Sequence, residues 1–340
     1  WIGSNQKHFV YEHRPMPLQR YWSDFAQPRA LAAVAAAGMS DLDLNGFQGA
    51  DRLFDYLKTL TPLQQLACEL PLADGAQLLI LEDVTGAGKT EAALILAQRL
   101  MDRGAGNSVY VGLPTMATAN QMFRRVGPLD KKLFVPGGRP NVVLAHGSRH
   151  LVDDFHVLPV SPDDRSYQAG EDSASAACSA WLGDSNKKAL LADIGVGTID
   201  QALLAAMPAQ HQALRMLGLI GKVLVIDEVH GFDSYTGQLL CSLLQAHARH
   251  GGSGILLSAT LPNELRNAFV DAFRKGCGIR PVDLASAEDR YPLLTYQSGE
   301  ATPEVHRVAS RAEVTRSLPI VFLHDEDEVF RLVTQQASSG

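Results

Sequence analysis

The chain has 340 residues, 46% of them hydrophobic and 20% charged, which is ordinary for a globular protein and argues against disorder. The net charge of −7 neither indicates nor excludes nucleic acid as a partner, because a binding groove needs only local positive charge. No segment approaches the roughly 20 apolar residues of a membrane span, and residues 1–5 are neither a signal peptide nor an initiator Met, so we expect a cytoplasmic chain cut from something longer.

The first 60 residues carry aromatic and Pro-rich stretches and an Ala-rich helical run from Pro28 to Ala37. A helix is then expected to begin at Pro62, because proline suits the first turn and Thr61 is a favoured N-cap. Gln64 lies in that turn, upstream of a glycine-rich loop, where its amide could donate to and accept from an adenine edge. On its own, such a glutamine is more often a surface residue of a helix.

Residues 78–101 have the order of an apolar strand, a glycine-rich loop and an apolar helix. Backbone N–H groups at a helix N-terminus form a positive cradle for a polyphosphate, and glycines let the backbone close on it. Lys89 would then reach the β and γ phosphates of ATP, and the Thr90 hydroxyl would hold Mg²⁺. The predicted nucleotide-binding residues are Gln64, Thr85, Gly86, Ala87, Gly88, Lys89 and Thr90.

One position departs from the G-x-x-x-x-G-K-[ST] pattern, because Asp83 stands where the first glycine belongs. A carboxylate near a phosphate is unfavourable unless its side chain points away. An ordinary glycine-rich turn before a core helix is therefore the alternative. We favour the phosphate loop because Gly88, Lys89 and Thr90 stand at the strand-to-helix junction that the chemistry requires.

Beyond the loop, apolar strands alternate with helices. We expect strands at 108–113, 142–145, 189–192, 222–226 and 254–257, and helices at 116–126, 199–207, 236–250 and 262–275. This alternation predicts an α/β fold with a doubly wound parallel sheet. The Ser/Asp-rich segment 161–179 is interpreted as a surface insertion, and 281–317 as a linker and an edge. Residues 319–323 are expected to open a new strand, followed by a helix.

An acidic pair, Asp227 and Glu228, follows the strand at 222–226, at the carboxyl end where open α/β sheets bind ligands. Asp227 would share Mg²⁺ with Thr90, and Glu228 would polarise the water that attacks the γ-phosphate. Considered by itself, the pair could be a capping pair, but the phosphate loop upstream strengthens the catalytic interpretation. The predicted catalytic residues are Lys89, Asp227, Glu228 and His230.

His230 and two hydroxyl residues stand near strand ends. His230, Ser258 and Thr260 could couple hydrolysis to a nucleic-acid groove through an imidazole and two hydroxyls. A helix N-cap before Pro262 is the other interpretation of Ser258 and Thr260, and both can hold at the same time.

These motifs occur in the order found in superfamily-two helicases. Over roughly residues 60–270 they resemble one family, the CRISPR-associated helicase-nucleases of type I systems. The phrases that carry the resemblance are Leu113-Pro114-Thr115-Met116-Ala117-Thr118-Ala119-Asn120, Val196-Gly197-Thr198-Ile199-Asp200-Gln201-Ala202-Leu203 and Ile226-Asp227-Glu228-Val229-His230. Trp1-Ile2-Gly3-Ser4-Asn5 is similar to the tail of that family's HD nuclease domain.

The resemblance implies a monomeric single-stranded DNA translocase that uses ATP and Mg²⁺ and is recruited by an RNA-guided type I surveillance complex. It also implies that an HD nuclease upstream of residue 1 cuts the DNA. By the same resemblance, Thr115, His146, Thr198 and Asp200 belong to the motifs that contact DNA.

The resemblance also implies a division into domains. Residues 1–60 would be the tail of the HD nuclease domain and a linker, 61–280 the first RecA-like domain, 281–318 a linker, and 319–340 the start of a second RecA-like domain. The arginines expected from that second domain would lie beyond residue 340. We therefore expect this chain, taken by itself, to bind ATP weakly and to show little DNA-stimulated hydrolysis.

Two other function classes stay open. A non-helicase phosphate-loop switch or kinase would want guanine-reading residues or an acceptor pocket, where the sequence offers Gln64 and Thr198. A non-catalytic binding module is disfavoured by intact Lys89 and Glu228.

Two local features could mislead. The dipeptide His324-Asp325 is interpreted as a strand end rather than as the nuclease, because no partner histidines stand at ligand spacing. The basic pairs Arg124-Arg125 and Lys131-Lys132 are interpreted as solvated helix ends rather than as DNA contacts.

Overall fold

A computed structural model describes residues 9–36, 42–136, 140–145, 189–282, 284, 291–299, 301–310, 322 and 325–339. The expected insertion at 161–179, His146, and most of the strand expected at 319–323 lie outside the described residues. The chain divides into two units, Trp1–Ala309 and Ser310–Gly340, which are described separately. Among the described helices, none has the length and apolar character needed to cross a membrane.

The first unit is built on a sheet whose eight described strands lie in the order β3-β4-β2-β5-β6-β1-β7-β8. The strands from β3 to β1 are parallel, whereas β7 and β8 continue the sheet antiparallel. Their bounds are β1 Gln77–Glu82, β2 Ser108–Leu113, β3 Val142–Ala145, β4 Ile194–Thr198, β5 Lys222–Ile226, β6 Gly254–Ser258, β7 Leu293–Ser298 and β8 Glu304–Arg307. The predicted α/β fold with a doubly wound parallel sheet is confirmed for the strands from β3 to β1, and the two antiparallel strands β7 and β8 make the whole sheet mostly, rather than entirely, parallel.

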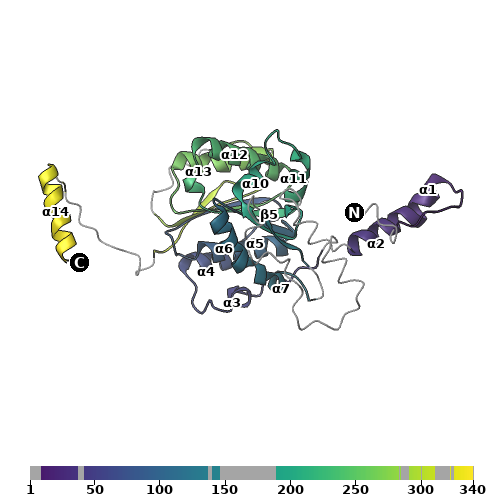
Figure 1. The fold of residues 1–340 in the computed structure, drawn as a ribbon, viewed down its shortest axis with the longest axis horizontal. Coiled ribbons are helices and arrows are strands. Elements are labelled where there is room, and N and C mark those ends of the chain that lie inside the picture. The colour runs from purple at the N-terminus through teal and green to yellow at the C-terminus, as the bar shows by residue number, and fades with distance from the viewer. Residues whose placement is uncertain are drawn as a thin grey trace. The chain divides into compact units, whose positions relative to one another are not determined.

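Helices cover both faces of this sheet (Figure 1). One face carries α3 Ala50–Leu53, α4 Pro62–Glu69, α5 Lys89–Asp102, α6 Met116–Val126 and α7 Asp130–Leu133. The other carries α10 Ile199–Leu203, α11 Gln212–Leu219, α12 Ser234–Arg249 and α13 Asn263–Gly276. Side chains alternate along each strand, so in β1 Leu79 and Leu81 join the core under α5, while Leu78 and Ile80 join the core under α12 and α13.

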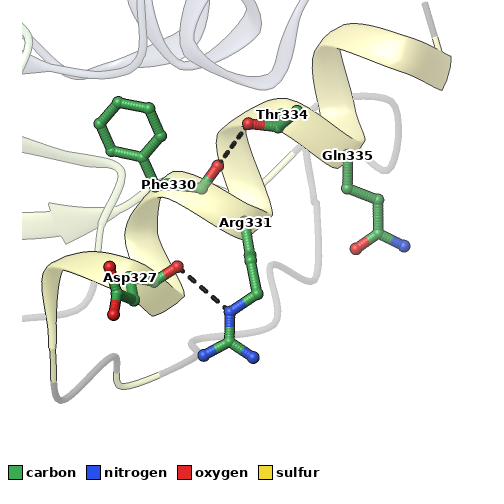
Figure 2. A pocket seen from close by; sticks show the side chains of 5 residues that line it. All are labelled: Asp327, Phe330, Arg331, Thr334 and Gln335. Atoms are coloured by element: carbon green, nitrogen blue, oxygen red, sulfur yellow. Dashed lines mark hydrogen bonds between the residues drawn. The ribbon is translucent and has the colours of Figure 1, made fainter.

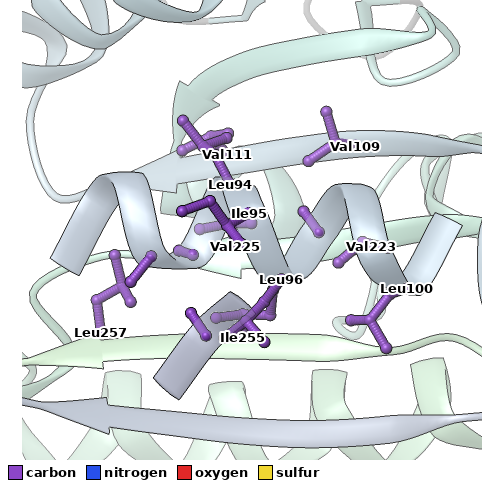
Figure 3. Packing of buried hydrophobic residues seen from close by; sticks show 14 of the residues in the cluster. Leu94, Ile95, Leu96, Leu100, Val109, Val111, Val223, Val225, Ile255 and Leu257 are labelled. Carbon is purple, nitrogen blue, oxygen red and sulfur yellow. The ribbon is translucent and has the colours of Figure 1, made fainter. Parts of the chain in front are cut away.

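Helix α5 lies across the centre of the sheet. Figure 3 shows Leu96 and its helix neighbours packed on Val111 of β2, Val225 of β5 and Ile255 of β6. Leu96 is fully buried, and truncating such a leucine to alanine typically costs about 2–5 kcal/mol. The first turn of α5, which carries the phosphate-loop lysine, is therefore anchored to the rigid middle of the domain.

The strand expected at 189–192 is wrong. The strand that pairs with β2 and β3 is β4, Ile194–Thr198, and the helix expected at 199–207 ends at Leu203. Glycine has low strand propensity, so the sequence around Gly195 and Gly197 does not indicate a strand. The apolar residues 189–192 just before it do, and this explains the wrong prediction. These glycines make room for a buried ring, because a Cβ at Gly195 would meet Tyr110 Cδ2 at 2.8 Å.

The expectation of a linker across 281–318 fails for its middle part, and the expectation of an edge holds there. Strand β7 pairs with β1, and β8 then forms the border of the sheet. The sequence does not indicate a buried strand at β7 because it contains the polar residues Thr295 and Gln297, which are nevertheless buried in the structure. Gln297 is satisfied there by Arg274 of α13, whose Nη1 donates to Gln297 Oε1 at 2.8 Å.

The N-terminal helical run expected from Pro28 is confirmed as α2, Gln27–Ala36, which continues α1, Leu18–Tyr21, and a π-helical segment, Trp22–Ala26. In the second unit, the helix expected after residue 323 is α14, Glu326–Ser339. Figure 2 shows a hollow lined by α14 residues, in which Thr334 Oγ1 donates to the Phe330 carbonyl at 2.7 Å. Because one helix supplies the whole lining, this hollow is the surface of a helix and not a binding site.

Candidate nucleotide-binding site

The loop between β1 and α5 has the backbone that a phosphate cradle needs. Gly86 and Gly88 have φ angles of 79° and 81°, in the left-handed region that favours glycine. An ideal Cβ at Gly86 meets nothing within 4 Å, and Thr85 and Gly86 are exposed, so the space above the loop is open. Gly88 is the N-cap of α5, and the half-buried Thr90 lies in the first turn of that helix. The backbone N–H groups at the start of α5 and the Thr90 hydroxyl therefore fit a magnesium–nucleotide.

Lys89 closes back over this loop. Its Nζ donates to the carbonyl oxygens of Asp83 at 2.6 Å and of Val84 at 3.0 Å. Burial lowers the pKa of Lys89, and the charges of Glu228, Asp227 and Asp83 oppose that shift. Within the part of the chain that the structure describes, the ammonium thus donates only to backbone oxygens while facing three carboxylates. A phosphate can displace those two hydrogen bonds without breaking an ion pair.

Asp83, the departure from the motif, turns onto its own loop. Its Oδ1 accepts a hydrogen bond from the Val84 N–H at 2.7 Å, and the residue is 7% exposed. The carboxylate therefore stabilises its own loop through a hydrogen bond, at a position where the usual glycine would rely on its conformational freedom. Its negative charge still acts on Lys89.

The acidic pair lies where the strand order predicts. Asp227 follows β5, and its N–H donates to the Gly112 carbonyl of β2 at 2.9 Å. Its Oδ1 accepts from the Glu228 N–H at 2.9 Å. Burial, then the charge of Glu228, raises the pKa of Asp227. A divalent cation would remove this penalty by giving the buried carboxylate a partner.

Glu228 adopts a strained backbone. Its φ of 56° and ψ of 39° place a residue with a Cβ in the left-handed region, which costs about 1–3 kcal/mol. From this backbone its side-chain Oε2 lies 3.1 Å from His230 Nε2. His230 Nδ1 in turn accepts a hydrogen bond from the Ala259 N–H at 3.2 Å. The acidic pair is thereby linked to the turn after β6.

Ser258 and Thr260 do not cap the following helix, because α13 begins at Asn263 with Pro262 as its N-cap. Instead, the fully buried Ser258 donates from Oγ to the Thr260 carbonyl at 2.8 Å, which tightens the turn. The N-cap interpretation is wrong.

Gln64 has both ends of its amide engaged. Its Oε1 accepts from the Thr61 N–H at 3.0 Å, completing a capping box, and its Nε2 donates to the Gly88 carbonyl at 3.3 Å. The predicted start of α4 at Pro62 with Thr61 as its N-cap is confirmed. Gln64 is only 2% exposed, so it contacts the phosphate loop directly instead of lying on the surface of its helix.

The predicted DNA-contacting residues that the structure describes lie at the same sheet edge. Thr115 caps α6 and is exposed, whereas Thr198 at the end of β4 is buried and its carbonyl accepts from the Tyr110 hydroxyl at 3.0 Å. Asp200 is exposed in the first turn of α10. The register Leu113↔Thr198 brings these two strand ends side by side.

Three long-range ion pairs were not predicted from the sequence. Glu82, at the end of β1, is fully buried and accepts from Arg266 Nε at 2.5 Å and Nη2 at 3.0 Å. Arg125 is not a simply solvated helix end, since it pairs with Glu91 of α5. Lys132 Nζ likewise pairs with Asp55 at 2.6 Å.

The curated proteins that this chain is similar to carry the same name. No protein-family model matches the chain. The chain is 40% identical over 305 residues to the CRISPR-associated endonuclease/helicase Cas3 of Escherichia coli, a match that covers 87% of this chain and 32% of that protein. It is 36% identical over 284 residues to Cas3 of Thermus thermophilus, covering 80% of this chain and 29% of the relative.

Solved structures agree. The chain matches the T. fusca Cas3–AMPPNP crystal structure with a TM-score of 0.73 and 29% identity, over 91% of this chain and 35% of that one. A chain of a CRISPR RNA-guided surveillance complex in a pre-nicking state matches with a TM-score of 0.55 and 26% identity, over 90% and 30% of the two chains. This chain therefore spans about a third of the length of these relatives.

Proposed function

Because the chain is a homologue of the Cas3 CRISPR-associated nuclease/helicases over about a third of their length, we propose that it is the ATP-driven motor segment of such an enzyme. It binds ATP and Mg²⁺ and turns hydrolysis into movement along single-stranded DNA in type I CRISPR interference. The observation that carries this proposal is the convergence of Lys89, Asp227 and Glu228 at the phosphate loop.

Each group at this edge has one task. Lys89 and the N–H groups at the N-terminus of α5 bind the phosphates, because that helix end is positive and its donors have no intrahelical partners. The Thr90 hydroxyl and the Asp227 carboxylate would hold Mg²⁺, which would supply positive charge against the phosphates. Glu228 orients and polarises the attacking water, and His230 fixes one of its carboxylate oxygens.

The proposed DNA path crosses the carboxyl ends of β2 and β4. Thr115 and Thr198 stand there, at the start of α6 and α10, and hydroxyls and helix N-termini suit a phosphate backbone tracked without sequence preference. Asp200 and His146 complete the proposed set. The partners proposed for the whole protein are an RNA-guided surveillance complex and an HD nuclease, since one similar chain was solved in such a complex.

A chimaera tests the proposal. The 340 residues would replace the matching segment of the Escherichia coli relative, and ATP hydrolysis would be measured with and without single-stranded DNA. We expect DNA-stimulated hydrolysis that Asp227→Asn abolishes, because the amide binds Mg²⁺ poorly and keeps nearly the same shape. A folded chimaera that hydrolyses ATP equally well with Asp227→Asn would contradict the proposal.

A further inference from the structure

A tyrosine outside the predicted motifs reaches the catalytic edge. Strand β7 runs antiparallel to β1, with Leu293 opposite Glu82, so β7 begins where β1 ends. Tyr291 precedes β7 by two residues, and its hydroxyl donates to the Ala259 carbonyl across the end of β1. The reversal of the edge strand is what brings Tyr291 there, because a parallel strand would begin at the opposite edge.

The turn that Tyr291 contacts is held at three consecutive carbonyls. The Ala259 carbonyl accepts from Tyr291, the Thr260 carbonyl from Ser258 Oγ at 2.8 Å, and the Leu261 carbonyl from Arg266 Nη2 at 3.3 Å. The same Arg266 is held by the buried Glu82, so the turn is fixed to the end of β1.

The other side of the Ala259 residue bonds His230. The Ala259 N–H donates to His230 Nδ1 at 3.2 Å, so this nitrogen carries no proton. The ring proton of the neutral imidazole is then on Nε2, which faces Glu228 Oε2 at 3.1 Å and donates to it. A continuous series of contacts thus leads from Tyr291 through Ala259 and His230 to Glu228.

We propose that Tyr291 is a positioning residue for Glu228: by holding the Ala259 carbonyl, it aims the Ala259 N–H at His230, fixes the imidazole tautomer, and thereby orients the carboxylate. The role assigned to Glu228 rests on the proposed function, whereas the control of the tautomer does not.

The surroundings of Tyr291 keep it a donor. The residue is half-buried. Burial, then the negative charge of Glu82, raises the pKa of the Tyr291 hydroxyl, so it stays protonated at working pH. A hydroxyl held in this state donates to a carbonyl at all pH values where ATP hydrolysis would be measured.

The test is the ¹⁵N imidazole spectrum of His230 in the 340-residue chain, with His230→Gln identifying its signals. We expect the native chain to show the Nε2–H tautomer and Tyr291→Phe to show a mixture of tautomers. Tyr296→Phe is the matched control, because Tyr296 lies on β7, the strand that Tyr291 precedes. Its hydroxyl donates to Gln77 Oε1 at 2.7 Å and accepts from the Ala73 N–H at 2.8 Å, away from His230. An unchanged spectrum in Tyr291→Phe, or equal changes in both variants, overturns the proposal.

A measurement on the native chain covers the case in which Tyr291→Phe does not fold. A scalar coupling across the Ala259 N–H···Nδ1 bond is expected, and its absence overturns the proposal. In the chimaera, Tyr291→Phe should slow hydrolysis about threefold to tenfold, the scale of one hydrogen bond, and leave Mg·ATP affinity unchanged. If the chimaera hydrolysed no ATP, the proposed function would fail while the spectra still decided the role of Tyr291.

Discussion

Two buried lysines at opposite edges of one sheet have different surroundings. Lys89, at the carboxyl edge, bonds two carbonyls of its own loop and faces three carboxylates. Lys222, the first residue of β5 at the amino edge, donates to Ser108 Oγ at 3.1 Å and to the Ala192 carbonyl, in segments far apart in the sequence. The comparison separates a cation available to a ligand from one that fastens strands together.

A histidine completes the amino-edge cluster. His247 is 1% exposed, and its Nε2 lies 3.0 Å from the Lys222 carbonyl and 3.2 Å from the Ser253 carbonyl, so Nε2 carries the proton. Its buried Nδ1 has no hydrogen-bond partner among the described residues. Because Lys222 and His247 are both buried, this edge should respond to pH through stability, whereas the carboxyl edge should respond through chemistry.

The largest effect expected at the carboxyl edge is on turnover. Glu228→Gln keeps the size and hydrogen bonding of the side chain but loses the carboxylate, so hydrolysis in the chimaera should fall about 10²-fold to 10⁴-fold. Mg·ATP binding should persist, because Lys89 and Asp227 are intact. Steady-state kinetics beside calorimetric binding check this, and near-native turnover would remove Glu228 from the mechanism.

At the amino edge, Lys222 should act on stability. Burial lowers its pKa from 10.5 to about 8. Between these values the unfolded chain binds more protons than the folded chain, so the free energy of unfolding rises with pH, by roughly 3 kcal/mol over the window. Urea unfolding from about pH 8 to pH 10.5 measures this, with Lys222→Met as the variant in which the rise disappears. A rise of equal size in Lys222→Met would show that other groups cause it.

His247 should produce a separate acid response of similar or smaller size. Burial lowers its pKa from 6.5 to about 4, so the unfolded chain binds the extra proton between these values, and stability is lost as pH falls through that window. Unfolding of His247→Gln should lack this acid loss, whereas the exposed His250→Gln should keep it. Parallel pH profiles for both variants would place the acid response elsewhere.

Features that depend on a local sequence pattern could be predicted, whereas features that depend on residues far apart in the chain could not. The places of Lys89, at the start of α5, and of Asp227, after β5, could be predicted because a glycine-rich loop and an acidic pair after an apolar strand are local patterns, whereas the roles of both residues stay predictions. Strand β4 was missed because its glycines serve the Tyr110 ring, which lies on another strand. The Glu82–Arg266 pair joins positions 184 residues apart, so no local pattern marks it.

The account depends most directly on whether Lys89 is held for a phosphate. Calorimetric titration of the 340-residue chain with Mg·ATP would compare the native chain, Lys89→Ala and Lys222→Met, at a temperature where all three are folded. We expect Lys89→Ala to weaken binding at least about 100-fold, the lower end of the scale for two hydrogen bonds to charged groups, and Lys222→Met to bind as the native chain does. Equal affinity in the native chain and Lys89→Ala would contradict the account.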